Sequence, residues 1–166
     1  MVEGLIERLG RWLEANRADY YARLLPGATE ADLNALEEEF ALKLSSAFRQ
    51  LYRWRNGQDG SCSASLWKNF MFAPLEAVAG SKRVCDELIG FDFEDPRWWR
   101  RSWVPFLNNG GGDHLCLDLA AEDGGTPGQL LVFYHDWEHR PIKFPNLEAW
   151  LTHLVESMEG GSYEVV

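Results

Sequence analysis

Three residues of types that often act in catalysis or metal binding, a histidine, a cysteine and an aspartate, occupy alternate positions of one short segment. A strand would place the side chains of His114, Cys116 and Asp118 on one face and the leucines between them on the other. His135 or His139 could then complete a metal site or a Cys–His dyad. Neighbours two positions apart on a strand are about 6.6 Å apart, however, which is too far for a direct Cys–His hydrogen bond. We therefore favour a half-buried strand face with a structural cysteine and a histidine whose hydrogen bonds are satisfied.

The glycine run at positions 110–112 is a second feature that could indicate binding chemistry. Phosphate-binding loops lead into the N-terminus of a helix, whereas this run leads into the predicted strand, and no Lys-Ser or Lys-Thr pair follows it. The run therefore predicts a turn in which Asp113 accepts hydrogen bonds from loop amides. The sequence also lacks a G-x-S-x-G motif. We expect no catalytic residue, no bound metal and no cofactor.

A segment rich in tryptophan and arginine, residues 97–103, is a better candidate for binding. Tryptophan and arginine are enriched among the residues that contribute most to protein interfaces. We predict partner contacts by Trp98, Trp99 and Arg100. In the alternative interpretation, the tryptophans cover the core and the arginines pair with the acidic residues before them, Asp92, Glu94 and Asp95. The sequence supports both interpretations, whereas stacking of nucleic-acid bases on these rings is disfavoured by the acidity of the chain.

Two further groups combine an aromatic ring with polar or acidic neighbours. One surrounds an expected helix end and comprises Trp54, Asn56, Gln58 and Asp59. The other lies on the last predicted hairpin and comprises Asp136, Trp137 and Glu138. Carboxylates beside an exposed ring suit a basic protein surface, because the charges attract the partner while the ring is desolvated in the contact. Asp113 is a further candidate contact, and a position of Trp54 in the core is an equally good interpretation.

The composition favours a protein-binding function over contact with nucleic acid or a membrane. Sixteen basic against 26 acidic residues give a net charge of −10, which repels nucleic acids and anionic lipids and attracts a basic partner. Solubility alone would also account for this charge. Aromatic residues reach 13%, with eight tryptophans, and this content is compatible with an aromatic contact surface in addition to the core.

We expect a cytoplasmic protein. The three cysteines are scattered and form no C-x-x-C pair, which indicates a reducing compartment rather than a disulfide framework. The N-terminal residues mix acids with bases and lack the apolar stretch of a signal peptide. No apolar run approaches the length that a membrane span needs.

Hydrophobic periodicity predicts helices in the N-terminal part of the chain. Helical spacing begins near Leu5 and continues to about Tyr21. Thr29 is a candidate N-cap for the next helix, with a capping box completed by the aspartate three residues later, and Ser45 can cap the helix after that. The Asn-Gly pair at 56–57 is expected to end this last helix, because these residues tolerate a left-handed conformation.

The rest of the chain predicts mainly strands. After a short strand at 70–73, Pro74 begins a helix. Period-two alternation then predicts strands at 103–107, 114–119, 129–135 and 140–144. Asn146 caps a last amphipathic helix. This order predicts a single α+β domain over residues 1–166, with a largely antiparallel sheet flanked by N-terminal helices and one C-terminal helix.

A family resemblance is carried by the segment LPGATEADLNALEEEF…LSSAFRQLYRWRNGQ, which lies within residues 24–60. It resembles the opening signature of the SUKH superfamily, in particular the group typified by the yeast Smi/Knr cell-wall regulators. Two later pieces agree in order and spacing, GGGDHLCLDL and GTPGQLLVFYHDWEHRPIKFPNLEAWL. The resemblance therefore covers most of residues 24–157. Ser45 stands where the family usually has proline, and residues 90–103 do not align.

The resemblance implies a non-enzymatic α+β binding domain. Stand-alone bacterial members typically act as immunity proteins that neutralise a secreted toxin, often a nuclease or a deaminase. Fungal relatives instead scaffold cell-wall signalling and carry long disordered flanks. The short chain favours the bacterial type, so the expected partner is a cognate protein toxin with a basic surface. The alternative is a scaffold or regulatory module with no toxin partner.

Overall fold

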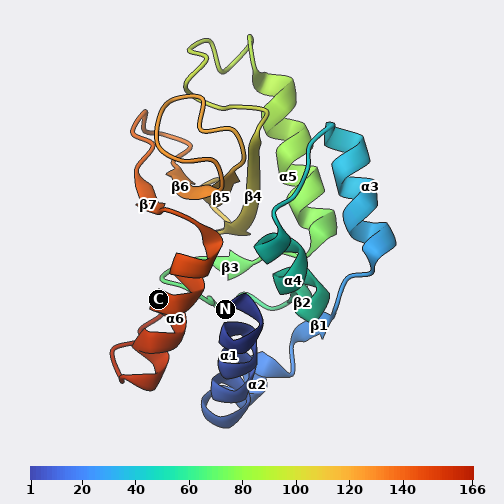
Figure 1. Cartoon of the computed structure of the whole chain (residues 1–166). Helices are drawn as coiled ribbons and strands as arrows, with labels where there is room; N and C mark the ends of the chain where they lie inside the picture. Colours follow the sequence, from blue (N-terminus) through green and yellow to red (C-terminus); the bar gives the residue numbers. More distant parts are fainter.

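Five antiparallel strands form the larger sheet of the structure (Figure 1). This computed structural model describes residues 1–166. The strands lie side by side in chain order: β3 (Met71–Phe72), β4 (Trp103–Asn108), β5 (His114–Asp118), β6 (Gln129–Phe133) and β7 (Ile142–Phe144). Each pairs antiparallel with the next, which allows short connections between most of them. All the predicted strands are present, with ends that differ by one or two residues.

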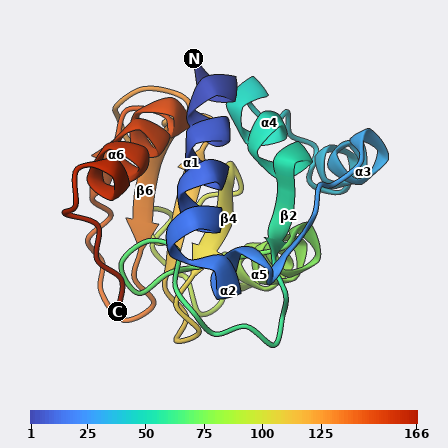
Figure 2. The same cartoon turned by 90° about the horizontal axis from the view of Figure 1, so that it is seen from below.

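Helices pack around this sheet and against one another: α1 (Val2–Asn16), α2 (Ala18–Tyr21), α3 (Glu30–Phe40), α4 (Ser46–Trp54), α5 (Leu75–Leu88) and α6 (Leu147–Glu159). The helices α1 and α6, from opposite ends of the chain, lie side by side (Figure 2). The predicted first helix is interrupted at Arg17, whose φ of −136° is not helical. None of the helices has both the length and the hydropathy needed to cross a membrane. The fold is a single α+β domain, as predicted.

The N-caps predicted for three helices are present. Thr29 and Asp32 form a reciprocal capping box at α3, with hydrogen bonds of 3.1 and 3.0 Å between each side chain and the other residue's amide. Ser45 and Asn146 each accept a hydrogen bond from the amide three residues later, at the starts of α4 and α6. These side chains satisfy amides that have no partner inside the helix. The three helix starts are therefore determined locally.

The Asn-Gly pair at 56–57 does not end a helix, contrary to prediction. The chain passes from α4 directly into β2 (Arg55–Gln58), which pairs with β1 (Leu24–Pro26) in a second, two-stranded sheet. Gly57 does have a left-handed φ of +71°. A Cβ at this position would lie 2.3 Å from the backbone nitrogen of Pro74. Glycine is therefore required by the close approach of two backbone segments rather than by a helix end.

Both faces of the larger sheet are buried. The main core lies between one face and the helices, and it includes Leu115 and Leu117 of β5. The opposite face carries a smaller cluster, here called the second cluster: Cys85, Trp99, Trp103, Cys116, Leu131 and Phe133. Part of α5 and the segment after it cover this face. Alternation along β5 therefore distributes the side chains between two buried layers. The prediction of a half-buried strand is wrong, because all the residues of β5 are buried.

Candidate protein-interaction surface

The alternating residues of β5 do not form a catalytic arrangement. Cys116 is fully buried, burial raises the pKa of its thiol, and its sulfur lies 4.0 Å from the backbone oxygen of His114. Asp118 accepts hydrogen bonds from the Gln129 side chain and from two loop amides after β5. Burial lowers the pKa of His114 to about 4, so its ring is neutral at neutral pH. The prediction that its hydrogen bonds are satisfied is wrong, because Nδ1 is buried without a partner.

The turn before β5 is held by asparagine rather than by Asp113. Asn109 Oδ1 accepts hydrogen bonds from the amides of Gly111 and Asp113 at 2.9 and 3.1 Å. The prediction that Asp113 satisfies the amides of its own turn is therefore wrong. The Asp113 carboxylate instead reaches the β6–β7 hairpin and accepts hydrogen bonds from the amide and the ring Nδ1 of His135, at 2.9 and 2.7 Å.

This Asp–His contact shifts the pKa values of both groups. Burial alone would raise the pKa of Asp113, but the hydrogen bonds from His135 and Asn109 lower it on balance. The hydrogen bond to Asp113 raises the pKa of His135. Asp113, His135 and Asp136 could also hold a metal ion, because one candidate ligand atom of each lies within 4.8 Å of the others. The Asp–His hydrogen bond accounts for this geometry without an ion, so we describe the group as a link between two loops.

The tryptophans of residues 97–103 divide between the core and the surface. Trp99 is 1% exposed, its Nε1 donates a hydrogen bond to Asp86 Oδ1 at 2.8 Å, and its ring packs edge-on against Trp103. The prediction that Trp99 contacts a partner is therefore wrong: the indole fills the second cluster and its polar atom is already paired. Trp98 is partly exposed and lies at the surface.

Two of the three arginines of this segment are neutralised within the chain, whereas Arg101 is exposed and makes no ion pair. Arg97 pairs with Asp95 at 3.2 Å, as the alternative interpretation predicted. Arg100 does not pair with the preceding acids. It reaches the β5–β6 connection, where its guanidinium lies 2.6 Å from Asp123 and 3.3 Å from Glu122. A partner that contacted Arg100 would have to compete with both carboxylates.

The predicted group around the end of α4 is mainly structural. Gln58 is 3% exposed and hydrogen-bonds a tyrosine hydroxyl and a backbone amide, so its predicted contact with a partner is wrong. Asn56 Oδ1 accepts a hydrogen bond from the first amide of α5 at 2.8 Å. Trp54 is partly buried against the main core. Asp59 remains half exposed and lies 3.8 Å from Arg23.

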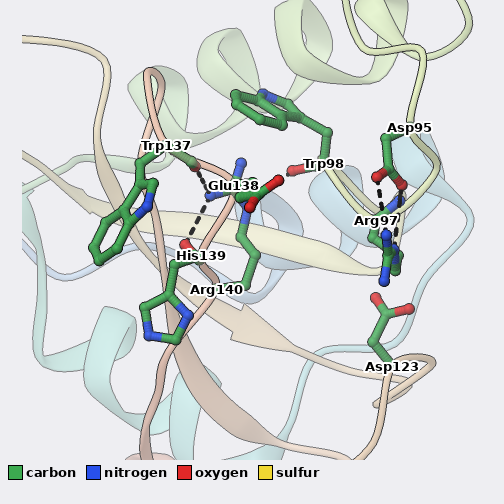
Figure 3. Close-up of a pocket in the computed structure, with 8 residues that line it drawn as sticks. All are labelled: Asp95, Arg97, Trp98, Asp123, Trp137, Glu138, His139 and Arg140. Atoms are coloured by element: carbon green, nitrogen blue, oxygen red, sulfur yellow. Dashed lines mark hydrogen bonds and ion pairs between the residues drawn. The ribbon is translucent and has the colours of Figure 1, made fainter.

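Two of the predicted groups meet in one pocket of about 690 Å³ (Figure 3). Trp98 comes from the segment after α5, and Trp137 and Glu138 come from the β6–β7 hairpin. The segment reaches the hairpin because it packs across the outer face of the sheet, on the second cluster. The other residues that line this pocket, here called the Trp137 pocket, are Asp95, Arg97, Asp123, His139 and Arg140.

Arg140 forms the centre of the Trp137 pocket, a role that no sequence pattern indicates. Its guanidinium carbon lies 4.8 Å from the ring centre of Trp98 and 4.5 Å from that of Phe133. The guanidinium donates hydrogen bonds to the backbone oxygens of Trp98, Trp137 and His139 at 3.0, 2.5 and 2.9 Å. No carboxylate pairs with it, and burial lowers its pKa. In the sequence, an arginine after an acidic loop is compatible with an exposed side chain as well as with a buried one. Only the folded structure therefore shows that Arg140 is central to the pocket.

Trp137 is the exposed ring of this pocket. It is 54% exposed, and its ring centre lies 5.4 Å from that of Tyr134 and 5.0 Å from that of His139. Its neighbours Asp136 and Glu138 are exposed and make no ion pair within the chain. An exposed ring between free carboxylates can desolvate against a partner while the carboxylates pair with its cations. Whether these residues contact a partner stays a prediction.

Several fungal proteins are similar to the chain over nearly its whole length. The "Cell wall biosynthesis/cell cycle regulator smi1" of Schizosaccharomyces pombe is 24% identical, over 95% of this chain and 36% of its own length. The "Glucan synthesis regulatory protein" of Neurospora crassa is 23% identical, over 96% and 38%. The "Cell wall assembly regulator SMI1" of Saccharomyces cerevisiae is 18% identical, over 93% and 40%. The chain thus spans about two-fifths of the length of these curated relatives.

The match to a family profile covers most of the same region. The profile of the SMI1 / KNR4 family (SUKH-1) matches residues 27–153, which run from the turn before α3 into α6 and include the Trp137 hairpin. The names of the relatives designate regulators rather than enzymes. Because the matched region is well over half of the 166 residues, the chain belongs to the SMI1 / KNR4 family (SUKH-1).

Proposed function

We propose that this protein is a non-enzymatic binding protein of the immunity type, which neutralises a cognate secreted bacterial toxin by direct contact in the cytoplasm. The observation that carries the proposal is Trp137, a large ring that is 54% exposed between two carboxylates without ion pairs. Tryptophan contributes strongly to binding when a partner removes it from water. The flanking carboxylates favour a partner with a basic surface, such as a nuclease or a deaminase.

The charges around the pocket support a basic partner. The exposed cation, Arg97, is paired with Asp95, and Arg100 is paired with Asp123. Arg140 is partly buried in the wall of the pocket and donates only to backbone oxygens. The carboxylates that remain free therefore dominate the field that an approaching protein meets, in line with the net charge of −10. Binding here would neutralise the toxin by covering its active site or by holding it in an inactive conformation.

A scaffold or regulatory module that bridges cellular proteins is the second candidate function. It is favoured by the names of the relatives, which describe regulators of cell-wall assembly and of glucan synthesis. The surface that we propose for a toxin would then serve another basic protein. The gene neighbourhood separates the two candidates, because an immunity protein is expected beside a toxin reading frame and a scaffold is not.

Co-expression tests the immunity function directly. We expect that expression of this chain rescues the growth of cells that produce the toxin encoded beside it, and that the two proteins elute as one complex in size-exclusion chromatography. An inactive toxin variant provides the control for growth. Failure of both rescue and complex formation would contradict the immunity function and leave the scaffold as the better candidate.

A further inference from the structure

A second hollow lies on the other side of the aromatic residues that border the Trp137 pocket. It is an open groove of about 460 Å³, a size typical of sites that take a ligand group. Apolar side chains of α5 and of the sheet form much of its lining, together with two imidazole rings: Val84, Leu88, Phe93, Phe133, His114 and His135. No aspartate, glutamate, lysine or arginine lines it. We call it the α5 groove.

The α5 groove and the Trp137 pocket are two parts of one surface. Phe93 lies between them, with its ring centre 5.9 Å from that of Phe133 and 6.3 Å from that of Trp98. On the hairpin, His135 lines the groove and Trp137 lines the pocket, two residues apart. A partner that covered Trp137 would therefore extend naturally over the groove.

Exposed apolar side chains gather beside this surface. Apart from residues at the two chain ends and Ile142 on β7, the large hydrophobic side chains that are exposed are Val84, Phe91 and Trp137, at 57%, 75% and 54%. Val84 lines the groove, and the Phe91 amide hydrogen-bonds the carbonyl of Leu88, which also lines it. Exposed apolar groups concentrated around an open hollow indicate a contact site rather than the scattered exposure found on any protein surface.

Acidic residues adjoin the lining residues of the groove in the chain, whereas the lining itself holds no carboxylate, lysine or arginine. Asp92 and Glu94 flank Phe93 in the chain, and Asp136 follows His135. These three carboxylates, here called the rim, are exposed and make no ion pair within the chain. Of the nearby cations, Arg83 is held by the Glu39 carboxylate at 2.8 Å, whereas Arg101 is exposed without an ion pair and lines another hollow together with Glu87. The rim therefore attracts positive charge, while the lining favours an apolar group.

We propose that the α5 groove receives an apolar side chain of leucine size from a basic segment of the partner, whose lysine or arginine neighbours pair with the carboxylates of the rim. This inference rests on the proposed function for the identity of the partner. It adds that the partner presents an apolar side chain flanked by lysine or arginine. Such an anchor would bury Val84, which lines the groove, and leave no charged group in the groove unpaired. The Trp137 pocket and the groove would then provide two adjacent anchor points.

A peptide titration tests the groove without the toxin. The probe is the acetylated and amidated pentapeptide Lys-Lys-Leu-Lys-Lys, added to the ¹⁵N-labelled full chain and followed by the amide signals of Val84, Leu88 and Gly112. The controls replace the leucine by alanine or all four lysines by glutamate. We expect saturable shifts at these amides with the leucine peptide. The affinity should fall by about threefold or more with the alanine peptide, which lacks the buried apolar group. It should fall by about threefold or more with the glutamate peptide as well, because its charges repel the carboxylates of the rim. Equal shifts with the alanine peptide, or none at the groove, would overturn the proposal.

A pair of matched variants tests the groove in the toxin complex. Val84→Glu and Ile142→Glu introduce the same charge at residues of similar exposure, 57% and 51%, but only Val84 lines the groove. We expect Val84→Glu to weaken the complex by about tenfold or more, Val84→Ser to weaken it less, and Ile142→Glu to leave it unchanged. Equal affinity of the wild type and both Val84 variants would show that the α5 groove does not contact the toxin, while the immunity function would stand. If the wild type itself binds no toxin, the immunity function fails and the peptide titration still decides the groove.

Discussion

At the scale of single residues, the surroundings of each indole decide what a tryptophan can do. The Nε1 of Trp99 is paired with a buried carboxylate, so this ring is held inside the second cluster. Trp98 packs on the Arg140 guanidinium and shows only part of its surface. Trp137 has more than half of its surface in solvent and stands between free carboxylates. Only the last of these combines exposure with charges that remain available to a partner.

Replacement of Trp137 by alanine should therefore reduce binding without unfolding the protein. We expect the affinity for the toxin to fall by about 30-fold or more, because an anchor tryptophan contributes about 2 kcal/mol or more. The free energy of unfolding should change by less than about 0.5 kcal/mol, because the ring is 54% exposed. Calorimetric titration and urea unfolding measure the two quantities. Trp54→Ala is the contrasting control: its ring packs on the main core, so this variant should lose stability and keep its affinity.

His114 should make stability depend on pH in acid. The ring titrates near 6.5 when unfolded and at about 4 when buried, so between these values the unfolded chain binds more protons than the folded one. The free energy of unfolding therefore rises with pH through this window, and the penalty for charging the buried ring is complete below it. The pKa difference sets an upper limit of roughly 3 kcal/mol for this effect.

Urea unfolding of the wild type and His114→Gln over this pH window isolates the contribution of His114. The stability difference between the two proteins should change steadily from pH 4 to 6.5 and become constant above that range. The His135–Asp113 contact affects stability in the opposite direction. Because the pKa of His135 is raised in the folded protein, its contribution to the free energy of unfolding is lost as the pH rises. It is present in both proteins and cancels in the comparison. A difference that is the same at every pH would show that His114 does not titrate on unfolding.

At the scale of elements, a buried charge network joins α5 to the segment that carries Trp98. The Lys82 side chain on α5 is completely buried, and its Nζ donates to Asp86 Oδ1 at 3.3 Å and to the Arg101 backbone oxygen. Asp86 also accepts the hydrogen bond from Trp99. Burial lowers the pKa of Lys82, although Asp86 opposes this shift. The network fixes where the segment crosses the sheet and so places Trp98 against Arg140.

Asp86→Asn should destabilise the protein by about 3 kcal/mol or more, because it leaves the buried Lys82 ammonium without its counter-charge. The combined variant Lys82→Met/Asp86→Asn should be more stable than Asp86→Asn alone, because no charge then remains buried. Urea unfolding of both single variants and the double variant gives the coupling energy. Additive effects within about 0.5 kcal/mol would show that the ion pair contributes no coupling.

At the scale of the whole molecule, the net charge of −10 acts before any contact forms. Free carboxylates on the hairpin and after α5 add a local negative field on the proposed contact surface. Fields of this kind accelerate the encounter with a basic protein and are screened by salt.

The association rate with the toxin should therefore fall by about tenfold or more between low ionic strength and about 0.15 M salt, while the dissociation rate changes much less. Stopped-flow fluorescence of a label on the toxin would measure both rates. Asp136→Asn/Glu138→Gln should reduce the slope of this salt dependence. A double substitution at distant exposed acids, Glu3→Gln/Glu7→Gln on α1, provides the matched control. An association rate that does not respond to salt would contradict steering by charge.

The helix starts and the strands could be predicted because their causes lie within a few residues. Thr29 and Asp32 cap α3 through contacts made inside one helical turn, and the alternation of β5 correctly indicated a strand. The prediction that the Asn-Gly pair ends a helix is wrong, because Gly57 instead allows the backbone to pack closely against Pro74, which is distant in the sequence. Three of the candidate contacts that the sequence predicts, Trp98, Trp137 and Glu138, line the Trp137 pocket, whereas no sequence pattern indicates the central role of Arg140.

Composition, caps and alternation were enough to specify an acidic α+β domain with an antiparallel sheet, because these features depend on neighbours along the chain. They could not specify what covers the second face of that sheet. Alternation assigns Cys116 and Leu131 to the same layer but says nothing of the segment that packs over them. The burial of Trp99, the exposure of Trp137 and the position of Arg140 between two rings all follow from that packing. They depend on contacts between distant parts of the chain, so only the folded structure decides them.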